Sequence, residues 1–194
     1  MSARAHEEKK RLRALARARA SAEAQRRETH ARRMIEHLLA SPVWPADGSS
    51  PVMAYLSLDD EPDLDGLWLA RSGATVAAPR IDWDRKAMDA AILASLDDTE
   101  TTRRVRQPPA TCPVVEPADL GLVLVPGLLF DPAGGRLGRG AGFYDRFLAR
   151  LGPAAVTCGV CYSAQVVDRV PTEEHDARVR MILTEDGIRE TSAT

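Results

Sequence analysis

Short apolar runs recur along the chain between helical or polar segments, and this alternation constrains the fold more than any other feature. Runs typical of buried strands lie at residues 52–58, 74–79, 120–126, 155–162 and 179–187. Helical patterns at residues 63–73 and 143–152, and a turn or short helix near Gln165, separate several of these runs. Strands that alternate with helices form layers around a mainly parallel sheet. We therefore expect an α/β fold, a three-layer α/β/α sandwich.

The chain begins with a basic helical region, residues 1–40, which we expect to pack on the rest of the protein. Apolar residues at helical spacing and abundant Ala, Arg, Glu and Leu predict helices there. Ser21 is a typical N-cap residue, so we expect it to begin a second helix. Residues 1–33 hold eleven Lys and Arg against four Glu, a net charge of +7 that leaves −9 for the remainder. A solvated helix face, a nucleic-acid surface and a source of phosphate contacts are all compatible with this charge.

Residues 82–117 show little hydrophobic periodicity. Four prolines and a stretch rich in Thr and Arg lie between Asp97 and Pro117. Proline interrupts both helices and strands. We expect a long loop with one strand near Met88.

The composition indicates a globular protein of one domain, spanning residues 1–194. Apolar residues make up 44% of the chain and charged residues 28%, the usual balance of a folded protein. No apolar run approaches the roughly 18 residues that a membrane span needs. The N-terminus lacks the apolar stretch of a secretory signal. We expect no membrane association and a cytoplasmic location.

Three cysteines, Cys112, Cys158 and Cys161, are an odd number that fits a reducing compartment. Cys158 and Cys161 are spaced as C-x-x-C, but they fall in a predicted strand, where positions three apart face opposite ways. No second pair of Cys or His stands nearby at zinc spacing. We interpret the pair as small buried residues.

A glycine-rich stretch follows the predicted strand at residues 120–126. Five glycines lie between residues 134 and 142, and glycine allows both positive φ and close approach of a ligand to the backbone. A helix is predicted next, and its N-terminus would attract phosphate. Arg136 and Arg139 add charge-assisted donors, while Asp145 fits either a bridging Mg²⁺ or a partner of the helix dipole. The stretch lacks both the Gly-Lys-Ser/Thr of a P-loop and the direct strand-to-glycine junction of a dinucleotide fingerprint. It predicts a phosphate site of another kind or, alternatively, a tight structural turn.

The segment "LVLVPGLLFDPAGGRLGRGAGFYDRFL" resembles the signature of the 5-formyltetrahydrofolate cyclo-ligase family, roughly PGLAFD, a spacer, then G-x-RLGRGGGYYDRFL. Further similarities cover nearly the whole chain in the same order. They are "KKRLR" at residues 9–13, "YLSLDDE" at 55–61, "APR" at 78–80, "VRQP" at 105–108, Gln165, and P-x-E-x-HD at 171–176. The resemblance implies a Rossmann-like topology. It also implies ATP- and Mg²⁺-dependent closure of 5-formyltetrahydrofolate to 5,10-methenyltetrahydrofolate, with release of ADP and phosphate.

The resemblance assigns nucleotide contacts to the first helix and to the glycine-rich loop. These contacts are Lys9, Arg13, Arg136, Leu137, Gly138, Arg139, Gly140, Ala141, Gly142, Phe143 and Tyr144. It assigns the reduced folate to Leu56, Glu61, Arg139 and Phe143. It assigns Asp145 and Asp176 as magnesium ligands, and Arg139 and Tyr144 as catalytic residues. For Asp176 the residues alone favour a loop-capping carboxylate.

Four positions depart from the family pattern. Ala141 replaces the usual glycine and would strain the loop if its φ were positive, and Phe143 stands where Tyr is commoner. Gln107 replaces a Glu, and Arg180 reverses a charge near the expected metal end. These changes concern the folate half more than the nucleotide half.

Two other functions stay open. A paralogue of the same fold could bind nucleotide or RNA without catalysis, although the basic cluster lacks the aromatic residues that stack on RNA bases, so nucleic acid is an unfavoured partner. An ATP-dependent ligase acting on a different substrate is the third hypothesis.

Overall fold

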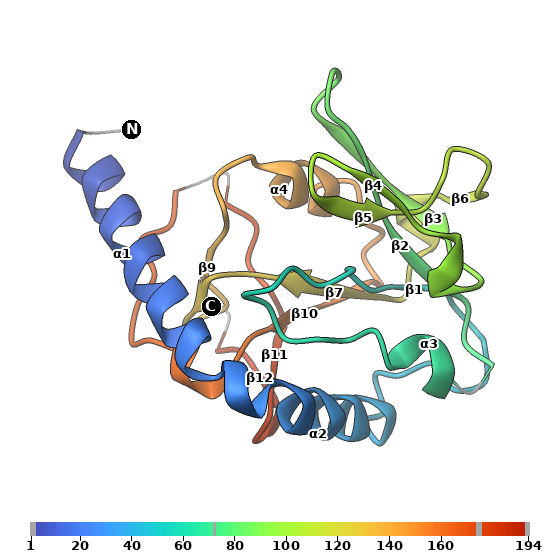
Figure 1. Ribbon diagram of the computed structural model, residues 1–194, viewed down its shortest axis with the longest axis horizontal. Coiled ribbons are helices and arrows are strands. Elements are labelled where there is room, and N and C mark those ends of the chain that lie inside the picture. Colours follow the sequence, from blue (N-terminus) through green and yellow to red (C-terminus); the bar gives the residue numbers. More distant parts are fainter. Residues whose placement is uncertain (1–2, 72, 174–175, 193–194) are drawn as a thin grey trace.

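The computed structural model describes residues 3–71, 73–173 and 176–192, and it is built around an eight-stranded sheet (Figure 1). In spatial order the strands are β12 (Gly187–Glu190), β11 (Met181–Thr184), β10 (Val156–Val160), β7 (Leu122–Pro126), β1 (Val52–Met53), β2 (Val76–Asp82), β3 (Ala87–Ile92) and β6 (Val114–Val115). The five strands from β11 to β2 are parallel, and only the outer strands pair in antiparallel fashion. In the centre, Val52 pairs with Val76 on one side and Leu122 on the other. The predicted mainly parallel sheet is confirmed.

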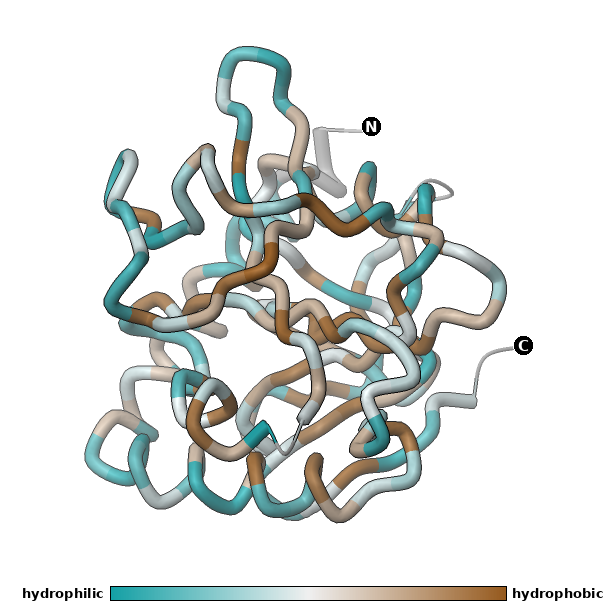
Figure 2. The backbone as a smooth tube through the Cα atoms, turned by 90° about the vertical axis from the view of Figure 1, so that its right-hand side faces the viewer, coloured by the Kyte–Doolittle hydropathy of each residue, from teal (hydrophilic) through white to brown (hydrophobic). Residues whose placement is uncertain are grey.

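Helices cover both faces of this sheet. Figure 1 shows α2 (Arg27–Leu39) and α3 (Leu67–Ala70) below it and α4 (Phe143–Leu148) above it. Neighbouring residues of β1 separate into the two cores, because successive side chains of a strand point to opposite faces. Val52 joins Met34 of α2 in one core, whereas Met53 joins Phe147 of α4 in the other. Apolar segments accordingly run through the interior of the molecule (Figure 2). The three-layer α/β/α prediction is confirmed.

The long first helix, α1 (Ala3–Ala22), lies at one side of the molecule, next to β9 in Figure 1. Its Ala16 is fully buried in a small third core with Leu128 and Leu137. The two predicted helices are present, but Ser21 lies inside α1 and does not cap the second one. The 3₁₀ turn η1 (Ala24–Arg26) makes the break, and Arg26 precedes α2 without a side-chain cap.

The region predicted as a long loop contains more structure than expected. The strand near Met88 is confirmed as β3. A hairpin of β4 (Glu100–Thr102) and β5 (Val105–Gln107) was not predicted, and neither was the short edge strand β6. The hairpin turns through Arg103 and Arg104, both at positive φ. Two-residue hairpin turns of this kind normally use Asn or Gly, so the sequence carries no turn signal here.

Other elements are shorter than predicted. The apolar run at 52–58 forms ladder pairs only at Val52 and Met53, and the predicted helix at 63–73 is reduced to α3. Within the glycine-rich stretch, β8 (Leu129–Phe130) and β9 (Arg136–Leu137) form a small antiparallel ribbon. The 3₁₀ turns η2 (Leu96–Asp98), η3 (Pro117–Asp119) and η4 (Ser163–Gln165) complete the structure, and η4 confirms the predicted turn.

Cys158 and Cys161 are fully buried free thiols that lie in opposite cores, as predicted for positions three apart on a strand. Among the helices that the structure describes, none combines the length and the apolar character that crossing a membrane requires.

Candidate active site

A cavity of 310 Å³ opens at the carboxyl ends of the central parallel strands. Tyr55 follows β1, Ile81 lies near the end of β2, and Pro126 ends β7; all three line the cavity. Open α/β sheets hold their ligands at this edge. The glycine-rich loop, which leaves the end of β7, forms the opposite wall from Gly138 to Asp145. The cavity therefore lies where the sequence placed a phosphate site.

Different structural constraints require glycine at different positions of this wall. Gly140 has φ 104° and Gly142 has φ 67°, a region that L side chains adopt only with strain. A Cβ on Gly138 would lie 2.9 Å from Nη1 of Arg136. Ala141 is not among the described non-glycine residues with positive φ, so its methyl group causes no strain of the kind considered from the sequence. The helix that follows, α4, has only six residues, and the loop amides and arginines must therefore provide most of the attraction for an anion.

Asp131 holds the base of the loop in place, and sequence reasoning did not single it out. Its buried carboxylate accepts hydrogen bonds from the backbone N–H groups of Gly135 at 2.8 Å, Ala133 at 3.0 Å and Val170 at 2.8 Å. A Cβ on Gly135 would come within 2.5 Å of this carboxylate. The aspartate of the "PGLLFD" segment, which carries part of the family resemblance, was the available signal.

Arg136 and Asp145 form an ion pair beside the cavity. Nη2 of Arg136 donates to Oδ1 of Asp145 at 2.5 Å, and Nη1 donates to the carbonyl of Pro126 at 3.4 Å. The arginine side chain is 5% exposed. Its guanidinium carbon lies 5.8 Å from the centre of the Tyr144 ring. The pair joins β9 to α4 and so closes the loop between them.

Arg139 reaches across the cavity to the loop that follows β1. Its Nε donates to Oε1 of Glu61 at 3.0 Å, and its Nη atoms bind both carboxylate oxygens of Asp60. Glu61 is buried, and its second oxygen accepts from the N–H of Leu58 at 3.0 Å. Burial raises the pKa of Glu61 above its usual value, although the charge of Arg139 opposes this shift. The predicted nucleotide loop and the predicted folate carboxylate are thus in direct contact.

Three buried polar atoms on the cavity wall have no hydrogen-bond partner among the described residues. They are the hydroxyl of Tyr144, Nε of Arg136 and the indole Nε1 of Trp83. Burial, followed by the nearby charge of Glu61, raises the pKa of Tyr144, so this hydroxyl stays protonated and can donate. Buried polar groups are nearly always paired, so these three atoms are available to pair with a polar ligand in the cavity.

Trp83 is a site residue that sequence reasoning missed, because the predicted loop around it offered no pattern. Its ring meets Phe143 edge to face, with centroids 5.4 Å apart and an interplanar angle of 86°. The guanidinium of Arg103, at the tip of the β4–β5 hairpin, lies 5.1 Å from the Trp83 ring centre. Trp83 and Phe143 thus form an aromatic part of the wall of the cavity that Glu61 also lines. The four residues assigned to folate, Leu56, Glu61, Arg139 and Phe143, all line this cavity.

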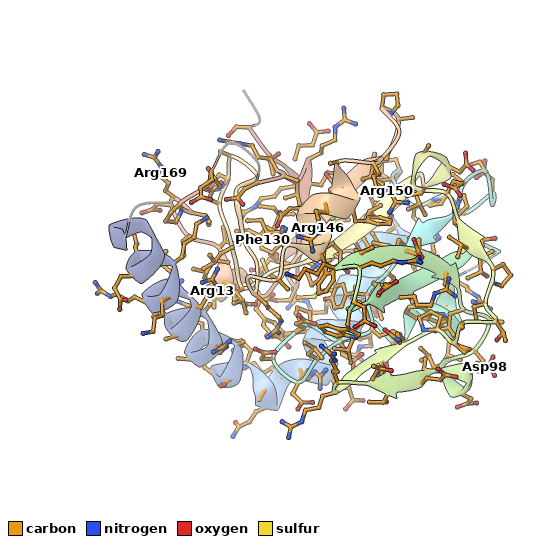
Figure 3. All side chains as sticks on the ribbon, turned by 90° about the horizontal axis from the view of Figure 1, so that it is seen from above. Arg13, Asp98, Phe130, Arg146, Arg150 and Arg169 are labelled. Carbon is orange, nitrogen blue, oxygen red and sulfur yellow. The ribbon has the colours of Figure 1, made fainter. Side chains whose placement is uncertain are left out.

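Two basic side chains of the first helix contact later parts of the chain, and one of them, Arg13, meets the glycine-rich loop. Arg13 extends from α1 toward the body of the protein (Figure 3), and its Nε donates to the carbonyl of Gly138 at 3.1 Å. Nζ of Lys9 donates to Oδ2 of Asp176 at 3.1 Å. The described residues that line the cavity do not include Lys9, Arg13 or Asp176.

The structure describes no group of three or more His, Cys, Asp or Glu side chains that could hold a metal ion. Asp145 and Asp176, the predicted magnesium ligands, are each paired with a cation of the chain, Arg136 and Lys9. Magnesium in nucleotide sites is usually held by one or two carboxylates together with phosphate oxygens. Of the two carboxylates, Asp145 lines the cavity and could share an ion with a nucleotide there, whereas Asp176 is not among the described lining residues.

The two remaining departures from the family pattern lie outside the cavity wall. Oε1 of Gln107 accepts from the N–H of Ile81 at 3.1 Å and so fastens the β4–β5 hairpin to β2. Arg180 is exposed, and its Nη1 donates to the carbonyl of Ala155 at 3.3 Å. Ala155 precedes β10, at the amino end of the parallel strands and therefore opposite the cavity. The reversed charge does not face the metal end, contrary to the expectation.

Comparison with known proteins identifies the family. The family profile described as "5-formyltetrahydrofolate cyclo-ligase family" matches residues 4–185. The chain belongs to this family. Cyclo-ligase family members are enzymes, and the family profile covers nearly the full length of this chain.

Individual cyclo-ligases show the same relationship. The 5-formyltetrahydrofolate cyclo-ligase of Mus musculus is 28% identical over 152 residues, which cover 72% of this chain and 75% of the mouse protein. That of Mycolicibacterium smegmatis is 39% identical over 77 residues, 40% of each chain, so this match spans less than half of the mycobacterial protein. The NMR structure of Aquifex aeolicus 5,10-methenyltetrahydrofolate synthetase superimposes with a TM-score of 0.82 at 26% identity, covering 96% of this chain and 94% of that one. The synthetase of Mycoplasma pneumoniae, with a TM-score of 0.72 at 19% identity, shares the fold.

Proposed function

We propose that this protein converts 5-formyltetrahydrofolate to 5,10-methenyltetrahydrofolate in a reaction that requires ATP and Mg²⁺ and releases ADP and phosphate. One observation carries the proposal. Arg139 of the glycine-rich loop contacts Glu61 of the loop after β1, and both residues line one cavity, which supports a single site for nucleotide and folate. A ring closure driven by phosphoryl transfer needs both substrates in one space, because positioning supplies much of the catalysis.

The nucleotide side is supported by the glycine-rich loop. Gly140 and Gly142 expose the backbone, and Arg136 and Arg139 provide forked donors that match phosphate oxygens. Arg13 holds the carbonyl of Gly138 and so positions the middle of the loop, a role that we propose beside direct phosphate contact. Lys9 neutralises the charge of Asp176, a carboxylate that would be available to a metal ion if this ion pair opened.

The folate side is supported by Glu61 and the aromatic wall. A carboxylate can accept hydrogen bonds from the N–H groups of a pterin ring, and Glu61 is buried at the right place to do so. The neutral hydroxyl of Tyr144 can donate to an oxygen that gains negative charge during the reaction. Phe143 and Leu56 supply apolar surface for the ring system. Arg139 touches both halves, which favours it as the group that stabilises charge during transfer.

Asp145 and Asp176 are the residues that would hold Mg²⁺. When bound, this ion would neutralise charge on the phosphate oxygens. Because Arg136 and Lys9 already pair with these carboxylates, the two cations keep the acidic side chains balanced when no nucleotide is present.

The test is direct. Purified protein with ATP, Mg²⁺ and 5-formyltetrahydrofolate should develop the methenyl absorbance, and omission of ATP or chelation of Mg²⁺ should abolish it. The mouse cyclo-ligase is the positive control. If the mouse enzyme turns over and this protein does not, in the same buffer, the proposal is wrong.

A further inference from the structure

Asp60 occupies the donors of Arg139 that a phosphate group would need. The two Nη atoms of this arginine bind the two oxygens of Asp60, while its Nε binds Glu61. Nη2 also lies 2.9 Å from Oε1 of Glu61. Every nitrogen of the guanidinium therefore has a carboxylate partner.

A carboxylate and a phosphate present the same pair of oxygens to an arginine fork. Asp60 and a phosphate cannot both take the two Nη atoms of Arg139 in this way. A nucleotide that uses these donors must displace the carboxylate of Asp60, and the two anions would repel each other if it stayed.

The two carboxylates differ in how readily they can leave. The Glu61 side chain is 8% exposed and is also held by the N–H of Leu58, whereas the Asp60 side chain is 26% exposed. Displacing Asp60 toward water costs less, because water can solvate its charge. Asp60 is therefore the exchangeable partner, and Glu61 is the fixed one.

We propose that Asp60 is a positioning residue that competes with the nucleotide for Arg139 and couples nucleotide binding to folate binding. The inference rests on the proposed function. A pterin ring that takes up the acceptors of Glu61 weakens the contact between Glu61 and Arg139. The guanidinium then loses one of the two carboxylates that hold it in the described position, and the nucleotide displaces Asp60 more easily. Such coupling is reciprocal, so bound nucleotide must also favour folate.

The test measures binding and not turnover. Affinity for a Mg²⁺-bound, non-hydrolysable ATP analogue is determined by calorimetry with and without saturating 5-formyltetrahydrofolate. The wild type should bind the analogue more tightly with folate, by about fivefold or more if the coupling is of ordinary size. Asp60→Asn should bind the analogue more tightly than wild type without folate and should gain less from folate. Asp60→Glu should restore the wild-type pattern.

Asp59→Asn is the matched control, because Asp59 is exposed on the same loop and its loss changes the net charge equally, but it is not a partner of Arg139. Asp60→Ser serves if Asp60→Asn does not fold. Equal behaviour of the Asp59 and Asp60 variants, or weaker nucleotide binding without Asp60, overturns the inference. In that case the methenyl assay of the wild type still decides the proposed function separately. A wild type that binds no nucleotide overturns both.

Discussion

The guanidinium of Arg136 and the carboxylate of Asp145 meet at 2.5 Å across the ends of the glycine-rich loop. Asp145→Asn should leave the charge of Arg136 buried without its partner, and breaking such pairs typically costs about 3 kcal/mol of unfolding free energy. Urea denaturation measures this cost, with the exposed Asp119→Asn as control. The variant should also lose the thermal stabilisation that Mg²⁺ with ATP gives the wild type. Equal stability of the two variants would show that the pair contributes nothing.

Glu61 gives the protein an unusual pH dependence. Its folded-state pKa is raised, mainly by burial, so the folded protein binds the proton of Glu61 more tightly than the unfolded chain does. The contribution of this group to stability is therefore largest at low pH and falls as the pH rises from the unfolded value of about 4.5 through the folded one. Glu61→Gln should lack this fall. Thermal unfolding of both proteins between acidic and neutral pH checks the difference, and parallel curves would contradict it.

Glu61→Gln should also abolish cyclo-ligase turnover without weakening nucleotide binding, because Gln cannot accept from two N–H groups with full charge and holds Arg139 less firmly. If turnover persists, the protein acts on its substrate without this carboxylate, and the hypothesis of a ligase for a different substrate gains support. Calorimetry with the ATP analogue supplies the folding control.

Trp83 should report ligand binding by its fluorescence. The chain has three tryptophans, and Trp83 is the one that lines the cavity, whereas Nε1 of Trp68 is bonded to the carbonyl of Leu93 in the core. Adding 5-formyltetrahydrofolate should quench the wild type. Trp83→Phe should lose this quenching, and Trp68→Phe should keep it. Loss of quenching in the Trp68 variant alone would place the ligand elsewhere.

Gly140 and Ala141 make a matched pair for the loop. Gly140→Ala forces a side chain into φ 104° and should destabilise the protein by about 1–2 kcal/mol and raise the KM for ATP. Ala141→Gly only adds freedom to the unfolded chain and should cost less than about 1 kcal/mol, with little change in KM. Urea denaturation and steady-state kinetics test both, and a larger effect at position 141 would contradict the loop geometry.

The predictable parts of the structure are those with a local cause. Apolar runs identified β2, β7, β10 and β11, and their alternation with helices identified the layers. The β4–β5 hairpin was not predicted, because its turn is formed by Arg103 and Arg104 and arginine has no preference for turns. The prediction that Ser21 caps the second helix was wrong because a good N-cap residue is also tolerated inside a helix. The backbone hydrogen bonds of α1 continue past Ser21.

The site divides in the same way. The glycine spacing and the basic residues predict a phosphate loop from the sequence pattern alone. Glu61, in contrast, was assigned to the site only through the family resemblance. Asp60 and Trp83 could not be found, because their roles arise from partners 79 and 60 residues away, Arg139 and Phe143. The hydrophobic periodicity of a sequence does not predict contacts between residues so far apart in the chain.

The first helix and the last part of the chain depend on each other. Lys9 meets Asp176 across 167 positions, and Arg13 meets Gly138 across 125. During synthesis, α1 leaves the ribosome well before its docking sites, so the helix stays undocked while the residues between them are made. A nascent chain stopped before residue 176 would therefore carry a free basic helix beside an unfinished site.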